Sequence, residues 1–289
     1  MSDDPIAQSY QRQTSHGRNM GLPSRFTAPD SVDNWRHTRM LAMSQPLVGA
    51  MPHATWLTVG DGAFGSDAAY LRSIGADVVA SSLVTDQLEE AARLGYINEF
   101  RRENAEALSL ADGSVDFVFC KEAYHHFPRP PIALYEMLRV SRVGVVLIEP
   151  MRGARLLDAT KQIMKRWIRG DVETRFEPAG NYIYRIDPEE LAHLMTAAGE
   201  LFIAMRCFND FYLPGLGRDS AAELTRGLLL TRLGIGVQDA LARCGLLAWG
   251  LCAVVLFKGV PSSAVLTALS AAGYSVRKLP VNPHLQARD

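Results

Sequence analysis

Two stretches of the chain carry residues whose types and spacing could do chemistry. The first is VGDGAFGS, in which Gly60, Gly62 and Gly65 stand between an apolar run and a predicted helix. Glycine costs backbone entropy, so this spacing predicts either a tight turn or a ligand that approaches the backbone closely. A strand, GxGxxG and a helix fit a nucleotide-like ligand, which would be a nicotinamide cofactor or an adenosyl cofactor without phosphates.

The second stretch is CKEAYHHFPRPP, the richest polar segment of the chain. It follows an apolar strand, so Glu122, His125 and His126 are expected at the ligand-facing edge of a sheet. Adjacent histidines in an extended segment point in opposite directions, so at most one of them readily faces an acceptor. A neutral imidazole there could take a proton from a hydroxyl or an amine, or the histidines could only support the loop. No third ligand at metal-binding spacing is evident, so we predict no metal site.

The elements that must position these residues alternate along the chain. Apolar strands are predicted at 56–59, 77–80, 115–120 and 143–148, and helices at 66–73, 85–94 and 132–140. Apolar strands separated by helices indicate a parallel sheet covered on both faces. Right-handed crossovers then build a doubly wound α/β fold.

The flanking segments follow a different pattern. The polar arm at 1–30 could be loose or folded over a site, and a helix is predicted from Ser31. Beyond Pro150 the predicted elements are a basic helix at 154–169, a helix at 188–198, a strand at 201–207, mixed helix to about 241 and a strand ending in CAVVLFK. This late helical and aromatic insertion would lie over the carboxyl ends of the strands. We divide the chain into an arm and helix (1–50), a cofactor-binding core (51–150) and the rest of the sheet with a substrate cap and a tail (151–289).

Composition excludes some partners and compartments. The 30 basic and 31 acidic residues give a formal net charge of −1, which argues against nucleic acid as the main partner. The strongest apolar stretch, at 245–257, is too short to span a bilayer, so no membrane partner is predicted. The opening MSDDPIAQ lacks the apolar core of a secretory signal, and the four cysteines form no CxxC pair. We therefore predict a cytoplasmic protein, and the sequence carries no signal of an oligomeric state.

Between residues 54 and 150 the chain resembles the class I S-adenosylmethionine-dependent methyltransferases, in the branch called methyltransferase type 11. That family has a glycine turn, ordered motifs before and along its fourth strand, and a strand ending in Glu-Pro. This chain repeats those motifs as NAEAL, DGSVDFV and ALYEMLRVSRVGVVLIEP. The resemblance implies a mostly parallel, seven-stranded Rossmann-like sheet, S-adenosylmethionine as cofactor and methyltransferase activity. It disfavours a nicotinamide oxidoreductase, and a non-catalytic adenosyl-binding or scaffolding protein remains the alternative.

The resemblance also implies where the cofactor is held. The glycine turn would hold the methionine portion, Asn104 and Ala105 would contact adenine, and the residues that end the fourth strand would border the methyl-transfer centre. Ser82 stands where the family usually has an Asp that binds the ribose, so the ribose contact is weaker or comes from Asp61 or Asp86. The expected cofactor contacts are Gly60, Asp61, Gly62, Gly65, Ser81, Ser82, Asn104, Ala105, Cys120 and Lys121.

The acceptor side is predicted from aromatic and polar side chains. GNYIYR, with Tyr182 and Tyr184, could form a lid over a small polar acceptor together with Glu177, Asn181 and Arg185, or it could only pack on the sheet. Tyr124, beside the histidines, is a further candidate contact of the acceptor. Aromatic faces stack on sugars, and both YHHFPRP and GNYIY resemble family members thought to serve sugar or polysaccharide biosynthesis. A sugar or polysaccharide precursor, methylated on oxygen or nitrogen, is therefore one candidate. The predicted catalytic residues are His126, His125 and Glu122, with His126 preferred because the Phe127–Pro128 turn adjoins it.

Overall fold

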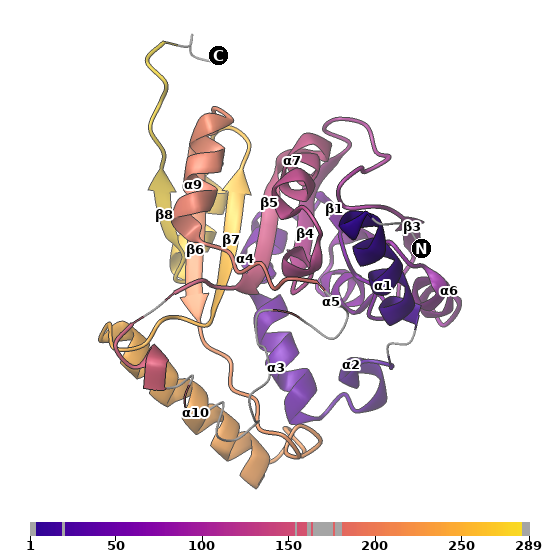
Figure 1. Cartoon of the computed structure of the whole chain (residues 1–289), viewed down its shortest axis with the longest axis vertical. Helices are drawn as coiled ribbons and strands as arrows, with labels where there is room; N and C mark the ends of the chain where they lie inside the picture. The colour runs from indigo at the N-terminus through magenta and orange to yellow at the C-terminus, as the bar shows by residue number, and fades with distance from the viewer. Residues whose placement is uncertain are drawn as a thin grey trace.

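The computed structural model describes residues 4–18, 21–153, 155–160, 163, 176 and 181–284. Eight strands form one sheet in the order β3-β2-β1-β4-β5-β7-β6-β8 (Figure 1). The strands are β1 (Thr55–Thr58), β2 (Asp77–Ser82), β3 (Glu99–Arg102), β4 (Val115–Lys121), β5 (Ser141–Pro150), β6 (Phe202–Phe208), β7 (Leu251–Phe257) and β8 (Ser275–Lys278).

The predicted doubly wound α/β sheet is confirmed, with one strand more than the seven expected. Strands β3, β2, β1, β4 and β5 are parallel, whereas β7 runs antiparallel between β5 and β6. The additional strand is β8, which pairs antiparallel with the outer edge of β6. Its four residues, SVRK, are short and largely polar, so they lack the apolar pattern that identifies a strand in a sequence.

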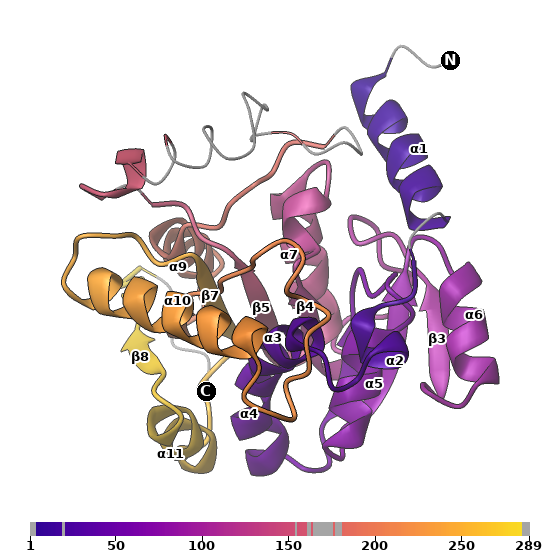
Figure 2. The same ribbon diagram turned by 90° about the horizontal axis from the view of Figure 1, so that it is seen from below.

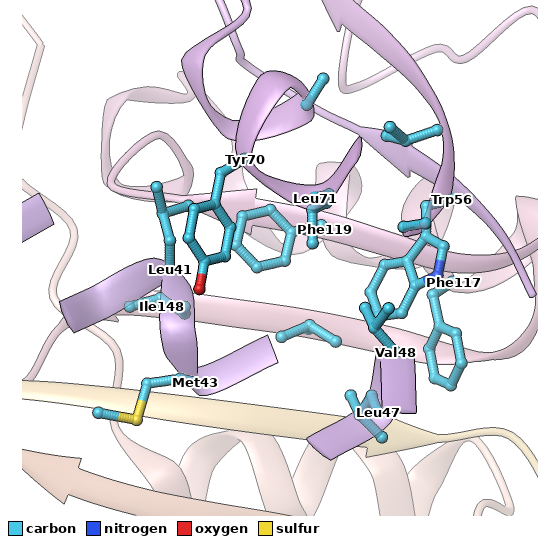
Figure 3. Packing of buried hydrophobic residues seen from close by; sticks show 14 of the residues in the cluster. Leu41, Met43, Leu47, Val48, Trp56, Tyr70, Leu71, Phe117, Phe119 and Ile148 are labelled. Carbon is cyan, nitrogen blue, oxygen red and sulfur yellow. The ribbon is translucent and has the colours of Figure 1, made fainter. Parts of the chain in front are cut away.

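Helices cover both faces because successive strand residues point to opposite sides. In β4, Phe117 and Phe119 pack under one helical layer, and Val118 and Cys120 pack under the other. Figure 3 shows the first layer, where Trp56 stacks on Phe117 with ring centroids 4.5 Å apart. That layer contains α3 (Val32–Leu41), η1 (Ala42–Ser44), α4 (Gln45–Ala50), α5 (Ser66–Ser73), α6 (Asp86–Arg93) and α11 (Ser263–Ala271), and the second contains α7 (Pro130–Val140) and α9 (Pro188–Ala197).

The N-terminal arm folds over the sheet edge that the glycine turn occupies. It forms α1 (Pro5–Arg18) and α2 (Ser24–Thr27), followed by α3, whose start is capped by Ser31 accepting from the Asn34 N–H at 3.2 Å. Side chains of α1 reach two distant segments: the Tyr10 hydroxyl donates to Asn104 Oδ1 at 3.3 Å, and Gln13 Nε2 donates to the His126 carbonyl at 2.6 Å. Figure 2 shows these N-terminal helices beside the parallel half of the sheet.

The late part of the chain adds α10 (Arg226–Arg243) beside α3, where the Arg232 guanidinium lies 5.4 Å from the centroid of the Trp35 ring. Most of the basic helix predicted at 154–169 falls outside the described residues. Among the helices that the structure describes, none combines the length and apolar character that crossing a membrane requires.

Candidate functional site

A cavity of about 440 Å³ lies at the carboxyl ends of β1, β2 and β4, where open parallel sheets bind ligands. One end is lined by the turn after β1, the end of β2 and residues 103–106. The other end is lined by the loop after β4 and by α3. The arm closes over both, through Tyr10, Gln13, Gly17, Gly21 and Arg25.

The three glycines of the turn are needed for different reasons. Gly60 has φ +80°, and a Cβ there would lie 2.5 Å from the Cβ of Ala123. Gly65 has φ +62° at the start of α5, and its Cβ would lie 3.0 Å from Ile97 Cγ2. Gly62 has an ordinary φ, lines the cavity and faces Ser82, whose Oγ would lie 3.0 Å from an added Cβ. The first and last therefore shape the turn, and Gly62 keeps the cavity wall free of a side chain.

Asp61 lines the cavity, but its carboxylate is directed into the protein. It accepts from Thr58 Oγ1 at 3.0 Å and from the backbone N–H groups of Asp67 (3.1 Å) and Ala68 (2.8 Å). These bonds satisfy two free donors at the start of α5. Burial and the nearby Asp67 raise the pKa of Asp61, whereas the bonds it accepts act in the opposite direction. Asp86 is exposed and lies 3.5 Å from Arg18 Nε, so neither acid is placed as the predicted ribose ligand.

The end of β2 separates its two serines. Ser82 lines the cavity, whereas Ser81 points to the opposite side and donates from its Oγ to the Thr58 carbonyl at 2.6 Å. Asn104 and Ala105 both line the cavity. The structure therefore brings Ser82, Asn104 and Ala105 together with the glycine turn, and it places Ser81 outside the group.

The start of the β4 loop carries a charge cluster in which Lys121 and Asp67 are nearly buried and Glu122 and His37 are partly exposed. Lys121 Nζ lies 3.6 Å from Asp67 Oδ1 and 3.2 Å from Glu122 Oε2, and His37 Nδ1 approaches the same Glu122 oxygen at 3.5 Å. Burial alone would lower the pKa of Lys121, but the two carboxylates raise it. Burial likewise opposes ionisation of Glu122, yet Lys121 and His37 hold its pKa below the usual range.

Two details of this loop differ from the sequence-based picture. Glu122 has φ +48°, a backbone conformation that costs a non-glycine residue energy and that clusters at functional sites. Cys120, predicted to border the methyl-transfer centre, is fully buried beneath the sheet edge, with Sγ 4.0 Å from Glu149 Oε1. It does not line the cavity, because alternation along β4 turns it into the second hydrophobic layer.

The two histidines have separate environments. They lie in a short 3₁₀ turn, η2 (Tyr124–His126), with ring centroids 4.0 Å apart. His125 is buried, and its Nδ1 lies 2.6 Å from Glu149 Oε2. His126 lines the cavity, and its Nδ1 lies 3.1 Å from the amide nitrogen of Asn181. Of the pair, His126 is thus the one placed toward a ligand.

Glu149 organises this loop from below, although the sequence identified it only as part of a family motif. Its side chain is fully buried, and Oε1 accepts from the backbone N–H groups of Ala123 and Tyr124, each at 2.9 Å. With His125 on Oε2, the carboxylate has a partner on each oxygen.

The predicted acceptor lid is brought to the cavity only in part, and its Glu177 lies outside the residues that the structure describes. Tyr124 is buried against Tyr184, whose hydroxyl donates to Glu190 Oε1 at 2.6 Å. Tyr182 is exposed beside Phe176, and Arg185 is exposed. Within the described part of the chain, Asn181 is the residue of this segment that lines the cavity. For Tyr184, the structure shows the alternative of packing on the sheet, where it lies against the buried Tyr124.

The N-terminal third supplies cavity residues that sequence reasoning missed. Asp33 and His37 lie one helical turn apart on α3 and both face the cavity. Their spacing of four residues on a predicted helix was a usable signal, but nothing local indicated that α3 would pack beside the β4 loop. No cluster of three His, Cys, Asp or Glu side chains suited to a metal ion occurs among the residues described.

Comparisons with known proteins agree with this geometry. Residues 57–148 match the family model described as "Methyltransferase domain". Over 100 residues the chain is 33% identical to 2-methyl-6-phytyl-1,4-hydroquinone methyltransferase of Synechocystis sp., covering 34% of this chain and 31% of that protein. A crystal structure of 1,6-didemethyltoxoflavin-N1-methyltransferase from Burkholderia thailandensis superposes with a TM-score of 0.50 at 14% identity, covering 90% and 93% of the two chains. That second likeness shows a shared fold, and the chain spans less than a third of the hydroquinone methyltransferase.

Proposed function

We propose that the chain, whose residues 57–148 match the methyltransferase domain model, is a class I S-adenosylmethionine-dependent methyltransferase that transfers the methyl group of that cofactor to a small-molecule acceptor. The observation that carries the proposal is the single cavity that joins the glycine turn and Asn104 to the charged loop after β4. The first group suits an adenosyl ligand, and the second is rich in groups that can bind or deprotonate an acceptor.

The residues present fit the cofactor. A Cβ at Gly62 would narrow the wall opposite Ser82, so this part of the cavity is kept free for a ligand. The backbone of the turn would hold the methionine portion, Ser82 the ribose, and Asn104 with Ala105 the adenine. When bound, the cofactor supplies a methyl group already activated on a sulfonium. The protein's main contribution is then to position the two reactants, which can supply about 7–11 kcal/mol of a barrier.

His126 is the candidate general base. Its Nδ1 faces the Asn181 amide, whose Oδ1 is buried without a hydrogen-bond partner. Turning this amide by half a turn would give Oδ1 a partner, because it would then accept from an Nδ1–H of His126. In that arrangement Asn181 fixes the tautomer in which Nε2 carries the lone pair. His126 then takes a proton from an acceptor hydroxyl or amine through Nε2, while Glu149 holds His125 and the loop.

The acceptor that we propose is a small molecule with a hydroxyl or amine group that receives the methyl group. The sugar considered from the sequence depended on the whole predicted lid. Of its described residues, Asn181 lines the cavity, whereas Tyr182, Tyr184 and Arg185 do not. The non-catalytic alternative would bind the cofactor without turnover.

Calorimetry tests the first step. S-adenosylmethionine or its demethylated product should bind with a dissociation constant of about micromolar order. Gly62→Val should abolish binding, because its side chain would fill the wall that faces Ser82. A folded wild-type protein that binds neither compound would contradict the proposal.

Turnover with an identified acceptor tests the base. His126→Ala should slow turnover about 10²–10⁴-fold with nearly unchanged cofactor affinity. His126→Asn distinguishes a base from a loop support, since Asn keeps hydrogen bonds but not basicity. Asn181→Ala should shift the pH profile of kcat/KM, a readout that a purely structural role would leave in place. Near-full activity of His126→Asn would exclude the histidine base.

A further inference from the structure

The outer face of α10 carries an exposed apolar stripe among the residues that the structure describes. Leu229, Leu233 and Val237 recur every four residues, and 52%, 60% and 50% of their respective surfaces are exposed. Because a helix turns every 3.6 residues, these side chains lie in one row. The opposite face of the helix carries buried Leu228 and Ile235. The stripe therefore lies on the side of α10 opposite its buried residues.

The stripe continues beyond both ends of the helix. Leu224, just before α10, is 74% exposed, and Leu246, just after it, is 38% exposed. The Leu157 N–H donates to the Leu246 carbonyl at 3.0 Å, which places Leu156, 78% exposed, beside that end. Figure 1 shows α10 along one edge of the molecule with this segment at its C-terminal end. The α10 surface consists of Leu156, Leu224, Leu229, Leu233, Val237 and Leu246.

Positive charge accompanies the α10 surface. Arg226 and Arg243 are exposed on the helix, Arg155 is exposed next to Leu156, and the exposed Arg232 lies over the Trp35 ring. One exposed acid, Glu223, adjoins Leu224. The one acid of α10, Asp239, is only partly exposed, and it accepts two hydrogen bonds from Asn209. An apolar row bordered by arginines, on a helix whose acid is bonded to the protein, is typical of helices that lie in the plane of a membrane interface.

We propose that the α10 surface docks on a bilayer that contains anionic lipid, with α10 lying in the headgroup region and not crossing it. The leucines would enter the acyl boundary, and the arginines would meet the lipid phosphates. A second copy of the chain is a poorer occupant, because joining two such stripes would bring arginines of both copies together. The prediction of no membrane partner rested on the lack of a spanning segment, which an interfacial helix does not need.

The α10 surface and the cavity lie on either side of α3. Trp35 on α3 packs under the Arg232 guanidinium, while Asp33 and His37 on the same helix line the cavity. One helix thus separates the docked surface from the proposed acceptor site. Docking on a bilayer is a property separate from methyl transfer, and vesicle binding is measured without turnover. Failure of the docking proposal and failure of the methyltransferase proposal are therefore distinguishable.

Vesicle sedimentation with the full chain tests the docking. We expect binding to phosphatidylcholine vesicles containing about a quarter phosphatidylglycerol, and at least about tenfold weaker binding to phosphatidylcholine alone. Leu229→Gln with Leu233→Gln should weaken binding at least about tenfold, because two exposed leucines no longer enter the bilayer. Arg226→Gln with Arg243→Gln should remove much of the preference for anionic lipid and the sensitivity to salt.

Matched controls make the result decisive. Ile132→Gln with Tyr135→Gln changes two similarly exposed apolar residues on α7 and should leave vesicle binding unchanged. Circular dichroism confirms that each variant is folded. Absence of vesicle binding by the wild type overturns the proposal, and so does equal loss in the α7 control. A dimer in light scattering that the Leu229/Leu233 variant separates would assign the surface to a second copy instead.

Discussion

Gly60 offers the most direct test of how the turn after β1 supports the site. Gly60→Ala places a residue with a side chain at φ +80°, which costs about 1–2 kcal/mol. The added Cβ would also lie 2.5 Å from the Cβ of Ala123, whereas carbon atoms in contact lie about 3.5–4.0 Å apart. Overpacking of this kind costs about 1–3 kcal/mol, so we expect a total loss of about 2–5 kcal/mol in the free energy of unfolding.

Two further variants separate these contributions in urea denaturation. Gly75→Ala has the same kind of backbone strain at φ +95° but meets no atom within 4 Å, so it should lose only the strain energy, about 1–2 kcal/mol. Adding Ala123→Gly to Gly60→Ala removes the atom that the new methyl meets and should recover about 1–3 kcal/mol as a coupling energy. Equal losses for Gly60→Ala and Gly75→Ala, with no coupling to Ala123, would refute the reasoning.

Three other predictions follow from single side chains. Ser82→Asp should preserve or tighten cofactor binding in calorimetry, by up to about 1–2 kcal/mol, and a large loss would mean that Ser82 does not face the ribose. Glu149→Gln should lower the free energy of unfolding by about 1–3 kcal/mol. The substitution turns one of the two carboxylate oxygens into an amide NH₂ donor, so either the bonds from the loop N–H groups or the contact with His125 is lost. Burial opposes ionisation of Glu122, but Lys121 holds its pKa below the unfolded value of 4.5, so it stabilises the fold above that pH and the stability is lost as the pH falls further. Urea denaturation from neutral to acidic pH should therefore give a shallower acid-side decline for Glu122→Gln than for the wild type.

Local patterns in the sequence were enough for the parallel half of the sheet and one end of the cavity. Continuous apolar runs predicted β1, β2, β4 and β5, because strands buried on both faces need apolar residues at every position. The order of glycine turn, NAEAL and Glu-Pro strand then placed Gly62, Asn104 and Ala105 at a common edge. The structure brings all three to the cavity.

Side-chain direction at that edge was not a local property. Asp61 turns its carboxylate to the free N–H groups of α5, and Ser81 and Cys120 point away from the cavity by strand alternation. Tyr124 and Tyr184 pack on each other, since burying two aromatic rings on the sheet is favourable. From the residue type alone, a side chain that bonds to or packs on other protein groups cannot be distinguished from one that faces a ligand.

The sequence by itself determined which segments form the parallel strands and where the glycine turn lies. Both depend on residues that are close together in the chain. Only the tertiary structure decided that α1 closes over the cavity, that His37 reaches Glu122 and that Glu149 holds His125. Each of these contacts joins segments far apart in sequence, and each depends on how whole helices pack on the sheet. No local periodicity records that packing, because it depends on the surfaces that two complete elements present to each other.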